Sequence, residues 1–144
     1  MVQGIKRGKM KIAICGSIKF FEQMVEIQRR LEDLGHAVLM PVKFEGVDYW
    51  GENNQSRVEA KRKFGAISRH FDKIKRAEAI LVVNLDKNEI KNYIGANTFL
   101  EIGFAYYLKK KIFLLNPIPE QGYIEDEIQT VEPTVLNGNL GGIK

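Results

Sequence analysis

Residues 79–116, AILVVNLDKNEIKNYIGANTFLEIGFAYYLKKKIFLLN, decide the fold of this chain of 144 residues. The apolar run at 79–84 predicts a buried strand, and a polar loop follows it at 85–96. A helix is expected over 97–109 with Asn97 as its N-cap, and residues 111–116 predict the next strand. A strand, a helix and a second strand in this order are typical of a parallel α/β sheet.

The rest of the chain extends this alternation. The remaining predicted elements are a strand at 11–15, a helix at 20–34 capped by Gly35, a strand at 37–40, a helix from a capping box at Ser56 to residue 77, and a short helix at 125–131. Residues 132–144 are expected to be irregular. The pattern predicts a flavodoxin-like three-layer α/β sandwich, with a parallel sheet of four or five strands in the order 2-1-3-4(-5).

Composition predicts one domain over residues 1–144, with residues 1–10 as an exposed N-terminal extension. Hydrophobic residues make up 44% and charged residues 28%, as in globular proteins. The single Cys15 and the lack of a long apolar run indicate a cytoplasmic protein without a membrane partner. A net charge of +4 favours anionic ligands, but it is too small to indicate a nucleic-acid partner.

Candidate site residues follow the carboxyl ends of the predicted strands, where ligands bind in such sheets. The crevice is expected between the first and third strands, where the strand order reverses. The candidates are Gly16, Ser17 and Lys19 after the first strand, Asp86 after the third, Asn97 and Glu101 on the next helix, and Asn116 after the fourth strand.

Glu101 is the central candidate because it is expected in the first turn of its helix. Unpaired N–H groups and the helix dipole stabilise a carboxylate there, which suits a nucleophile or a general base. A plain helix-stabilising charge is the alternative interpretation. His70 on the preceding helix is either an acid–base group or a histidine at the edge of the core.

The other candidates have equally open interpretations. Gly16-Ser17 can let a phosphate approach a helix start beside Lys19, or it can form a tight turn with Ser17 as N-cap. Asp86 can bind a sugar hydroxyl or nearby backbone. The basic run at 61–76 is interpreted as a solvated helix face. No set of residues has metal-ligand spacing, so neither a metal nor a cofactor is expected.

Three segments resemble the nucleoside 2-deoxyribosyltransferase-like superfamily, which includes the 2′-deoxynucleoside 5′-monophosphate N-glycosidases. They are ICGSI after the first strand, AEAILVVNLD around the third, and GANTFLEIGFAYYLKKKIFLL beyond it. The resemblance covers roughly residues 11–116. It implies a flavodoxin-like fold, a homodimer or larger oligomer, and cleavage of the bond between a base and C1′ of a deoxyribose.

The resemblance also implies roles for single residues. Glu101 matches the carboxylate that attacks C1′, and Gly16, Ser17, Ile18 and Lys19 match the loop that holds the sugar and its phosphate. Two positions depart from the family pattern. Ala13 stands where the family often has a Tyr, and His70 stands where it has an Asp that helps protonate or orient the leaving base.

Three hypotheses follow for the function. The first is a nucleoside or nucleotide N-glycosidase or 2-deoxyribosyltransferase with Glu101 as nucleophile and His70 as the acid. The second is a nucleotide-binding or sensor protein without turnover, which the two departures favour. The third is a structural protein whose site has decayed.

Overall fold

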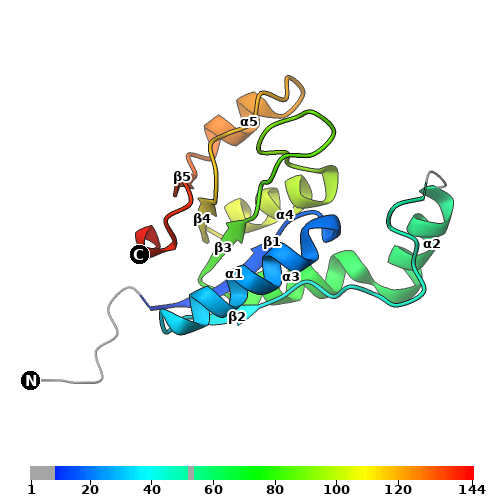
Figure 1. The fold of residues 1–144 in the computed structure, drawn as a ribbon, viewed down its shortest axis with the longest axis horizontal. Coiled ribbons are helices and arrows are strands. Elements are labelled where there is room, and N and C mark those ends of the chain that lie inside the picture. Colours follow the sequence, from blue (N-terminus) through cyan, green and yellow to red (C-terminus); the bar gives the residue numbers. More distant parts are fainter. Residues whose placement is uncertain (1–8, 52–53) are drawn as a thin grey trace, which may run out of the picture.

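The computed structural model describes residues 9–51 and 54–144. In chain order the elements are β1 (Lys11–Cys15), η1 (Ile18–Phe20), α1 (Phe21–Asp33), β2 (Ala37–Leu39), α2 (Asn54–Phe64), α3 (Ala66–Arg76), β3 (Ala79–Val82), α4 (Ala96–Tyr107), β4 (Lys111–Leu114), α5 (Glu125–Thr130), β5 (Thr134–Val135) and η2 (Leu140–Gly142). The strands form one parallel sheet in the order β2-β1-β3-β4-β5 (Figure 1). The predicted flavodoxin-like order is therefore confirmed, with the short fifth strand present.

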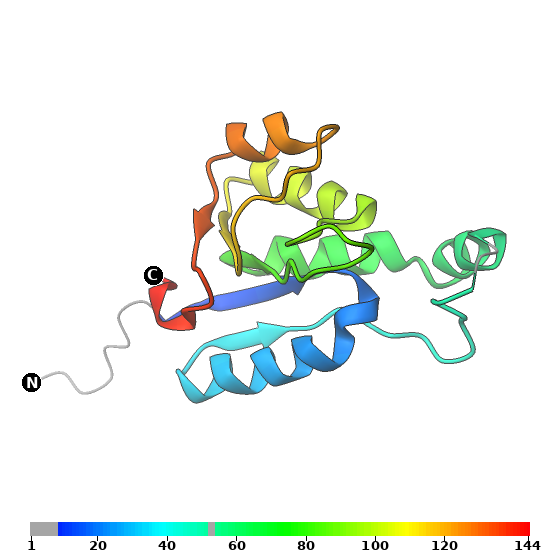
Figure 2. The ribbon, with the colours of Figure 1, turned by 45° about the horizontal axis from the view of Figure 1, so that its top comes forward.

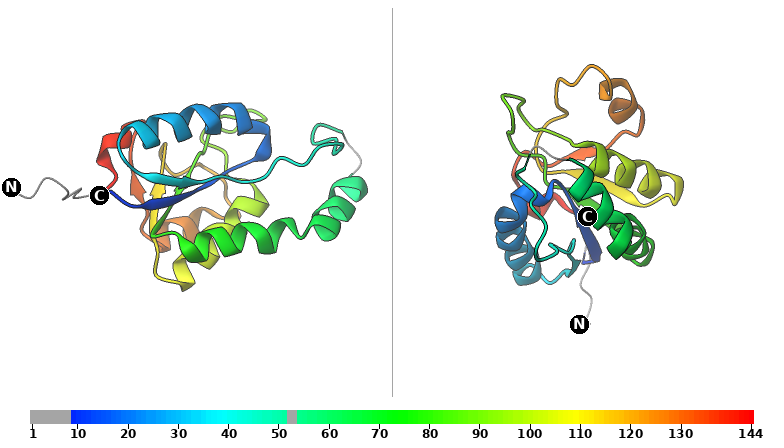
Figure 3. Two further views of the ribbon diagram at one scale, coloured as in Figure 1. Left: turned by 90° about the horizontal axis from the view of Figure 1, so that it is seen from below. Right: turned by 90° about the vertical axis from the view of Figure 1, so that its right-hand side faces the viewer.

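Helices cover both faces of the sheet and form three layers. Figure 3 shows α1 on one side of the strands and α3 and α4 on the other. Successive residues of a strand point to opposite faces, so Ile12 and Ile14 pack on the α1 side while Ala13 and Cys15 pack on the α3/α4 side. None of the helices in the described ranges is long and apolar enough to cross a membrane.

The predicted single helix from Ser56 to residue 77 is wrong, because the structure divides it at Gly65. Gly65 adopts a left-handed backbone conformation with φ +59°, which glycine tolerates best and which ends α2. The apolar spacing continues in phase across the break, so periodicity alone did not reveal it. As a result α2 projects beyond the carboxyl ends of the strands, and none of its 11 residues is buried (Figure 2).

The two ends of the chain also differ from expectation. Of the predicted exposed extension, residues 1–8 lie outside the described residues, but Met10 is buried in the α1-side core. Its N–H donates to Nδ1 of His36 at 3.1 Å. The tail predicted as irregular contains β5 and η2, and its Leu136, Leu140 and Ile143 pack in the same core.

Asn84 joins the ends of β3 and β4 through its fully buried side chain. Its Nδ2 donates to the carbonyl oxygens of Asn116 at 2.9 Å and Pro117 at 3.1 Å. The N–H of Asn116 donates to Oδ1 of Asn84 at 2.9 Å, and Nδ2 of Asn116 donates to the Asn84 carbonyl at 3.0 Å. These four hydrogen bonds give both asparagines a structural role where the strands end.

Replacing Asn84 by alanine is expected to lower the free energy of unfolding by about 2–4 kcal/mol, because three backbone groups lose their partner in a buried position. Urea unfolding measures the loss. The matched control, Asn116→Ala, removes one side-chain hydrogen bond and should cost only about 1 kcal/mol. Equal losses in the two variants would contradict this assignment.

Candidate functional site

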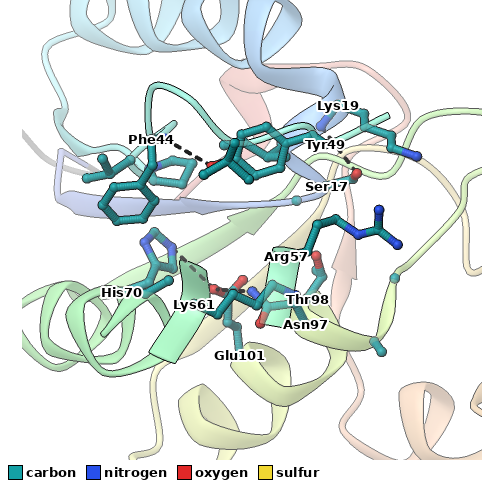
Figure 4. A pocket seen from close by; sticks show the side chains of 18 of the residues that line it. Ser17, Lys19, Phe44, Tyr49, Arg57, Lys61, His70, Asn97, Thr98 and Glu101 are labelled. Atoms are coloured by element: carbon teal, nitrogen blue, oxygen red, sulfur yellow. Dashed lines mark hydrogen bonds and ion pairs between the residues drawn. The ribbon is translucent and has the colours of Figure 1, made fainter. Parts of the chain in front are cut away.

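The candidate site is a pocket of about 550 Å³ beyond the carboxyl ends of the strands. Its walls come from the turn after β1, the loops after β2 and β3, and residues of α2, α3 and α4 (Figure 4). Small-molecule sites have volumes of about 300–1,000 Å³, so this pocket has room for a nucleotide-sized ligand. It lies next to the β1–β3 pair, where the strand order reverses as the sequence predicted.

Seven of the nine predicted site residues line the pocket. They are Gly16, Ser17, Ile18 and Lys19 on the turn after β1, His70 on α3, and Asn97 and Glu101 on α4. Ser17 caps η1, since its Oγ accepts from the Lys19 N–H at 3.3 Å. Position 16 favours glycine, because an added Cβ would lie only 3.1 Å from the carbonyl oxygen of Val83 and the backbone would have to shift slightly.

Asp86 and Asn116 are the two predicted residues that do not line the pocket. Asp86 is exposed, and its Oδ1 accepts from the Asn92 N–H at 3.0 Å. This contact with loop backbone fits the structural interpretation of Asp86. Asn116 makes the paired contacts with Asn84 that join β3 to β4.

Glu101 lies deeper and further along α4 than predicted. The helix begins at Ala96 after the N-cap Gly95, so Asn97 is not the N-cap and Glu101 lies in the second turn. The helix dipole acts mainly within the first turn, whereas the Glu101 carboxyl is only 4% exposed. Burial raises its pKa to about 8, against the opposing effects of Cys15 and Lys61. The expectation that the helix start holds Glu101 ionised is therefore wrong.

Cys15, His70 and Glu101 meet at the inner end of the pocket. Cys15 Sγ lies 3.6 Å from His70 Nε2, which lies 3.9 Å from Glu101 Oε2. Burial raises the pKa of Cys15 well above its usual value, with a further contribution from Glu101. Burial and then Lys73 lower the pKa of His70 to about 4. At neutral pH the contact between His70 and Glu101 therefore joins mainly uncharged groups, and it is not an ion pair.

The two ring nitrogens of His70 have different surroundings, since Nε2 contacts Cys15 and Glu101. Its Nδ1 is buried and has no hydrogen-bond partner in the part of the chain that the structure describes. The backbone of Ile14 still lies close enough to raise the pKa of His70 and offset part of the lowering. His70 is thus a neutral core-edge histidine that also contacts the pocket.

The same three side chains form a possible metal-ligand set, which the sequence analysis missed. Ligand atoms of Cys15, His70 and Glu101 all lie within 4.8 Å of one another. They come from β1, α3 and α4, so no sequence spacing reveals them. Thiolate, imidazole and carboxylate are ligands that Zn²⁺ accepts. The cationic side chains that line the pocket oppose a divalent cation there.

Six basic side chains line the pocket, and Glu101 is the only acidic residue among the described residues that line it. The six are Lys19, Arg57, Lys61, Arg69, Lys73 and Lys87. The basic run at 61–76 was interpreted as a solvated face, and Lys61 and Arg69 are indeed exposed, whereas Lys73 is half-buried. All three also line the pocket, which that interpretation did not include. The break at Gly65 redirects the helix, and so the run reaches the pocket from both α2 and α3.

None of these six side chains forms an ion pair with a carboxylate of the described residues. Lys87 shows the consequence, because burial and then the charges of Lys19 and Arg57 lower its pKa. Like charges ~4 Å apart repel by roughly 1 kcal/mol even in water. The basic side chains of the pocket therefore repel one another, and an anionic ligand would relieve that repulsion.

Aromatic side chains supply the apolar part of the lining through Phe44, Tyr49 and Tyr93. The Tyr49 hydroxyl accepts from the Phe44 N–H at 3.0 Å, which fixes the loop after β2 (Figure 4). Phe44 also stacks on Phe64 of α2 with ring centroids 4.6 Å apart. Such rings suit the face of a planar base.

Titration of Glu101 is expected to make stability depend on pH. The Glu101 carboxyl keeps its proton up to about pH 8 in the folded protein, but only up to about pH 4.5 in the unfolded chain. The protonated carboxyl therefore stabilises the folded state, and this stabilisation is lost as the pH rises through about 8. His70 acts in the opposite direction, but only up to about pH 6.5. Between pH 6.5 and 8 the natural protein should therefore lose about 2 kcal/mol relative to Glu101→Gln.

Urea unfolding of both proteins at several pH values measures this difference, with Glu22→Gln on the exposed face of α1 as the control variant. A difference between natural protein and Glu101→Gln that stays constant from pH 6.5 to 8 would contradict a raised pKa at Glu101.

A scan of the chain against protein-family models gives no match, and a search of curated proteins gives none either.

Proposed function

We propose that the protein cleaves or transfers the N-glycosidic bond of a nucleoside or nucleoside 5′-monophosphate, with Glu101 as nucleophile. One observation carries the proposal: the Glu101 carboxyl lies at the wall of a nucleotide-sized pocket whose opposite wall is the Gly16-Ser17 turn. The cationic and aromatic lining supports the same ligand class, because a nucleotide combines an anionic group with a planar base.

The proposed reaction resembles retaining glycoside hydrolysis. A carboxylate oxygen of Glu101 forms a bond to C1′ while the bond from C1′ to the base nitrogen breaks. The base leaves with the electron pair and takes up a proton. Water then attacks C1′ of the glycosyl ester, which releases the sugar and restores Glu101. Attack by a second base in place of water gives transfer.

Glu101 must lose its proton before it can attack, and its pKa of about 8 sets the pH at which it does so. The rate at low substrate concentration should therefore rise with pH up to about 8. Lys61 assists, since its positive charge favours the ionised carboxyl.

His70 supports Glu101 in this proposal and does not act as the acid. With a pKa of about 4 it is uncharged at neutral pH and has no readily available proton for a leaving base. Its Nε2 lies 3.9 Å from Glu101 Oε2, which favours a positioning role. The leaving base then takes its proton from water or from an acidic group of the ligand itself.

Nucleotide binding without turnover is the second candidate function. It is favoured by the protonated state of Glu101 at neutral pH and by the lack of a second carboxyl in the described pocket lining. Both candidate functions imply the same class of ligand, and they differ in whether the ligand is recovered intact.

Incubation with deoxyribo- and ribonucleosides and their 5′-monophosphates is expected to release free base, which chromatography detects. Glu101→Ala should reduce release at least 10³-fold, because no other described carboxyl lines the pocket to attack C1′. Glu101→Gln should bind the same ligands without turnover, and Glu59→Gln on the exposed part of α2 serves as the control.

If the natural protein binds the ligands and every ligand is recovered intact, the second candidate function is supported in place of the enzyme.

The expected homodimer stays a prediction, and a measurement of the mass of the protein in solution tests it. Leu100, Tyr106 and Tyr107 of α4 are more than half exposed and are apolar side chains that a second copy would cover.

A further inference from the structure

We propose that the pocket is built for a nucleoside di- or triphosphate, whose terminal phosphates lie among Lys19, Arg57 and Lys87. The inference rests on the proposed function for one point only, the position of the sugar beside Glu101. With the sugar there, the phosphate chain runs along the turn after β1 toward the outer end of the pocket.

The three cations meet at one end of the pocket although they come from three separate elements. Lys19 lies on η1, Arg57 on α2 and Lys87 in the loop after β3. Figure 4 shows Ser17, Lys19 and Arg57 together at the end of the pocket away from His70 and Glu101. Lys87 lines the same pocket as Lys19 and Arg57, and the charges of these two side chains contribute to the lowering of its pKa.

Each of these cations has a contact that holds it in position, and none pairs with a carboxylate in residues 9–51 and 54–144. Nζ of Lys19 lies 4.9 Å from the ring centroid of Trp50, and Nζ of Lys87 lies 4.6 Å from that of Tyr93. The guanidinium of Arg57 donates to the carbonyl oxygen of Gly51. Aromatic faces and a carbonyl orient a cation but leave its charge in place. Three oriented cations without a carboxylate partner in the described part of the chain form a binding site for an anion.

The amount of charge favours more than one phosphate. A phosphate monoester has a charge of about −1.5 to −2 at neutral pH, which is less than the three positive charges at this end. Each further phosphate adds negative charge and oxygen acceptors, and the fork of Arg57 can bind two of those oxygens at once. A di- or triphosphate therefore compensates the cluster, whereas a monophosphate leaves part of it uncompensated.

The other three basic residues of the lining, Lys61, Arg69 and Lys73, make contacts elsewhere in the pocket and do not compete for the phosphates. Lys61 lies close enough to Glu101 to favour its ionised form. Nζ of Lys73 donates to the Met40 carbonyl at 2.8 Å, and Arg69 lies over the ring of Phe44 at 5.9 Å. These side chains surround the sugar and base region. The cluster of Lys19, Arg57 and Lys87 is thus the part of the pocket left for the phosphate chain.

Calorimetric titration of Glu101→Gln with deoxyadenosine mono-, di- and triphosphate tests the proposal without interference from turnover. EDTA is present so that no metal ion binds the phosphates. The triphosphate is expected to bind at least tenfold tighter than the monophosphate. Inorganic tripolyphosphate should displace the bound triphosphate, and orthophosphate at the same concentration should not.

A second substitution in the Glu101→Gln background locates the effect. Arg57→Gln and, separately, Lys87→Gln should weaken triphosphate binding at least tenfold and monophosphate binding less than threefold. Arg62→Gln is the matched control, because it removes the same charge from the same helix but does not line the pocket. It should leave both affinities within twofold.

Equal affinity for mono- and triphosphate would overturn the proposal, as would an effect of Arg62→Gln equal to that of Arg57→Gln. Release of base together with equal affinities refutes the phosphate assignment and leaves the proposed function intact. Tighter triphosphate binding without release of base from any nucleotide supports the phosphate assignment and refutes the enzyme. Failure of every nucleoside and nucleotide to bind overturns both.

Discussion

Burial of the Glu101 carboxyl is the constraint on which this site depends. Two elements that cover one face of the sheet, α3 and α4, enclose it beside His70 and Cys15. Folding therefore holds a carboxyl out of water, and it keeps its proton to about pH 8. A buried carboxyl of this kind costs free energy to ionise. In the proposed reaction the positive charge of Lys61 favours the ionised carboxyl that attacks C1′.

The cationic lining is the complement of that buried carboxyl. Six basic residues surround the pocket, and none of them pairs with a described carboxylate. The repulsion among them costs stability, and a protein retains such a cost where function needs it. The anionic ligand that we propose would remove the repulsion, and Lys61 near Glu101 favours the charge that the proposed reaction requires. The buried carboxyl of Glu101 and the basic side chains of the pocket lining are thus parts of one electrostatic arrangement.

The sequence predicted the sheet well because short apolar strands and amphipathic helices alternate along it, and right-handed crossovers leave few orders. It also predicted that Gly16, Ser17 and Glu101 share a crevice, since strand ends meet at one edge. It failed at Gly65, where helical spacing continues across a break. It failed again at Cys15, whose contact with His70 links residues 55 positions apart. Local patterns contain no information about burial depth, so the raised pKa of Glu101 could not be predicted from the sequence.

Covalent capture of the sugar on Glu101 is the most direct test of the central claim. The natural protein would be mixed with substrate, quenched in acid during turnover, digested and analysed by mass spectrometry. We expect the added mass of the sugar, with any phosphate, on the peptide that contains Glu101, and no such mass in Glu101→Gln. Release of free base by Glu101→Ala at the rate of the natural protein would contradict it.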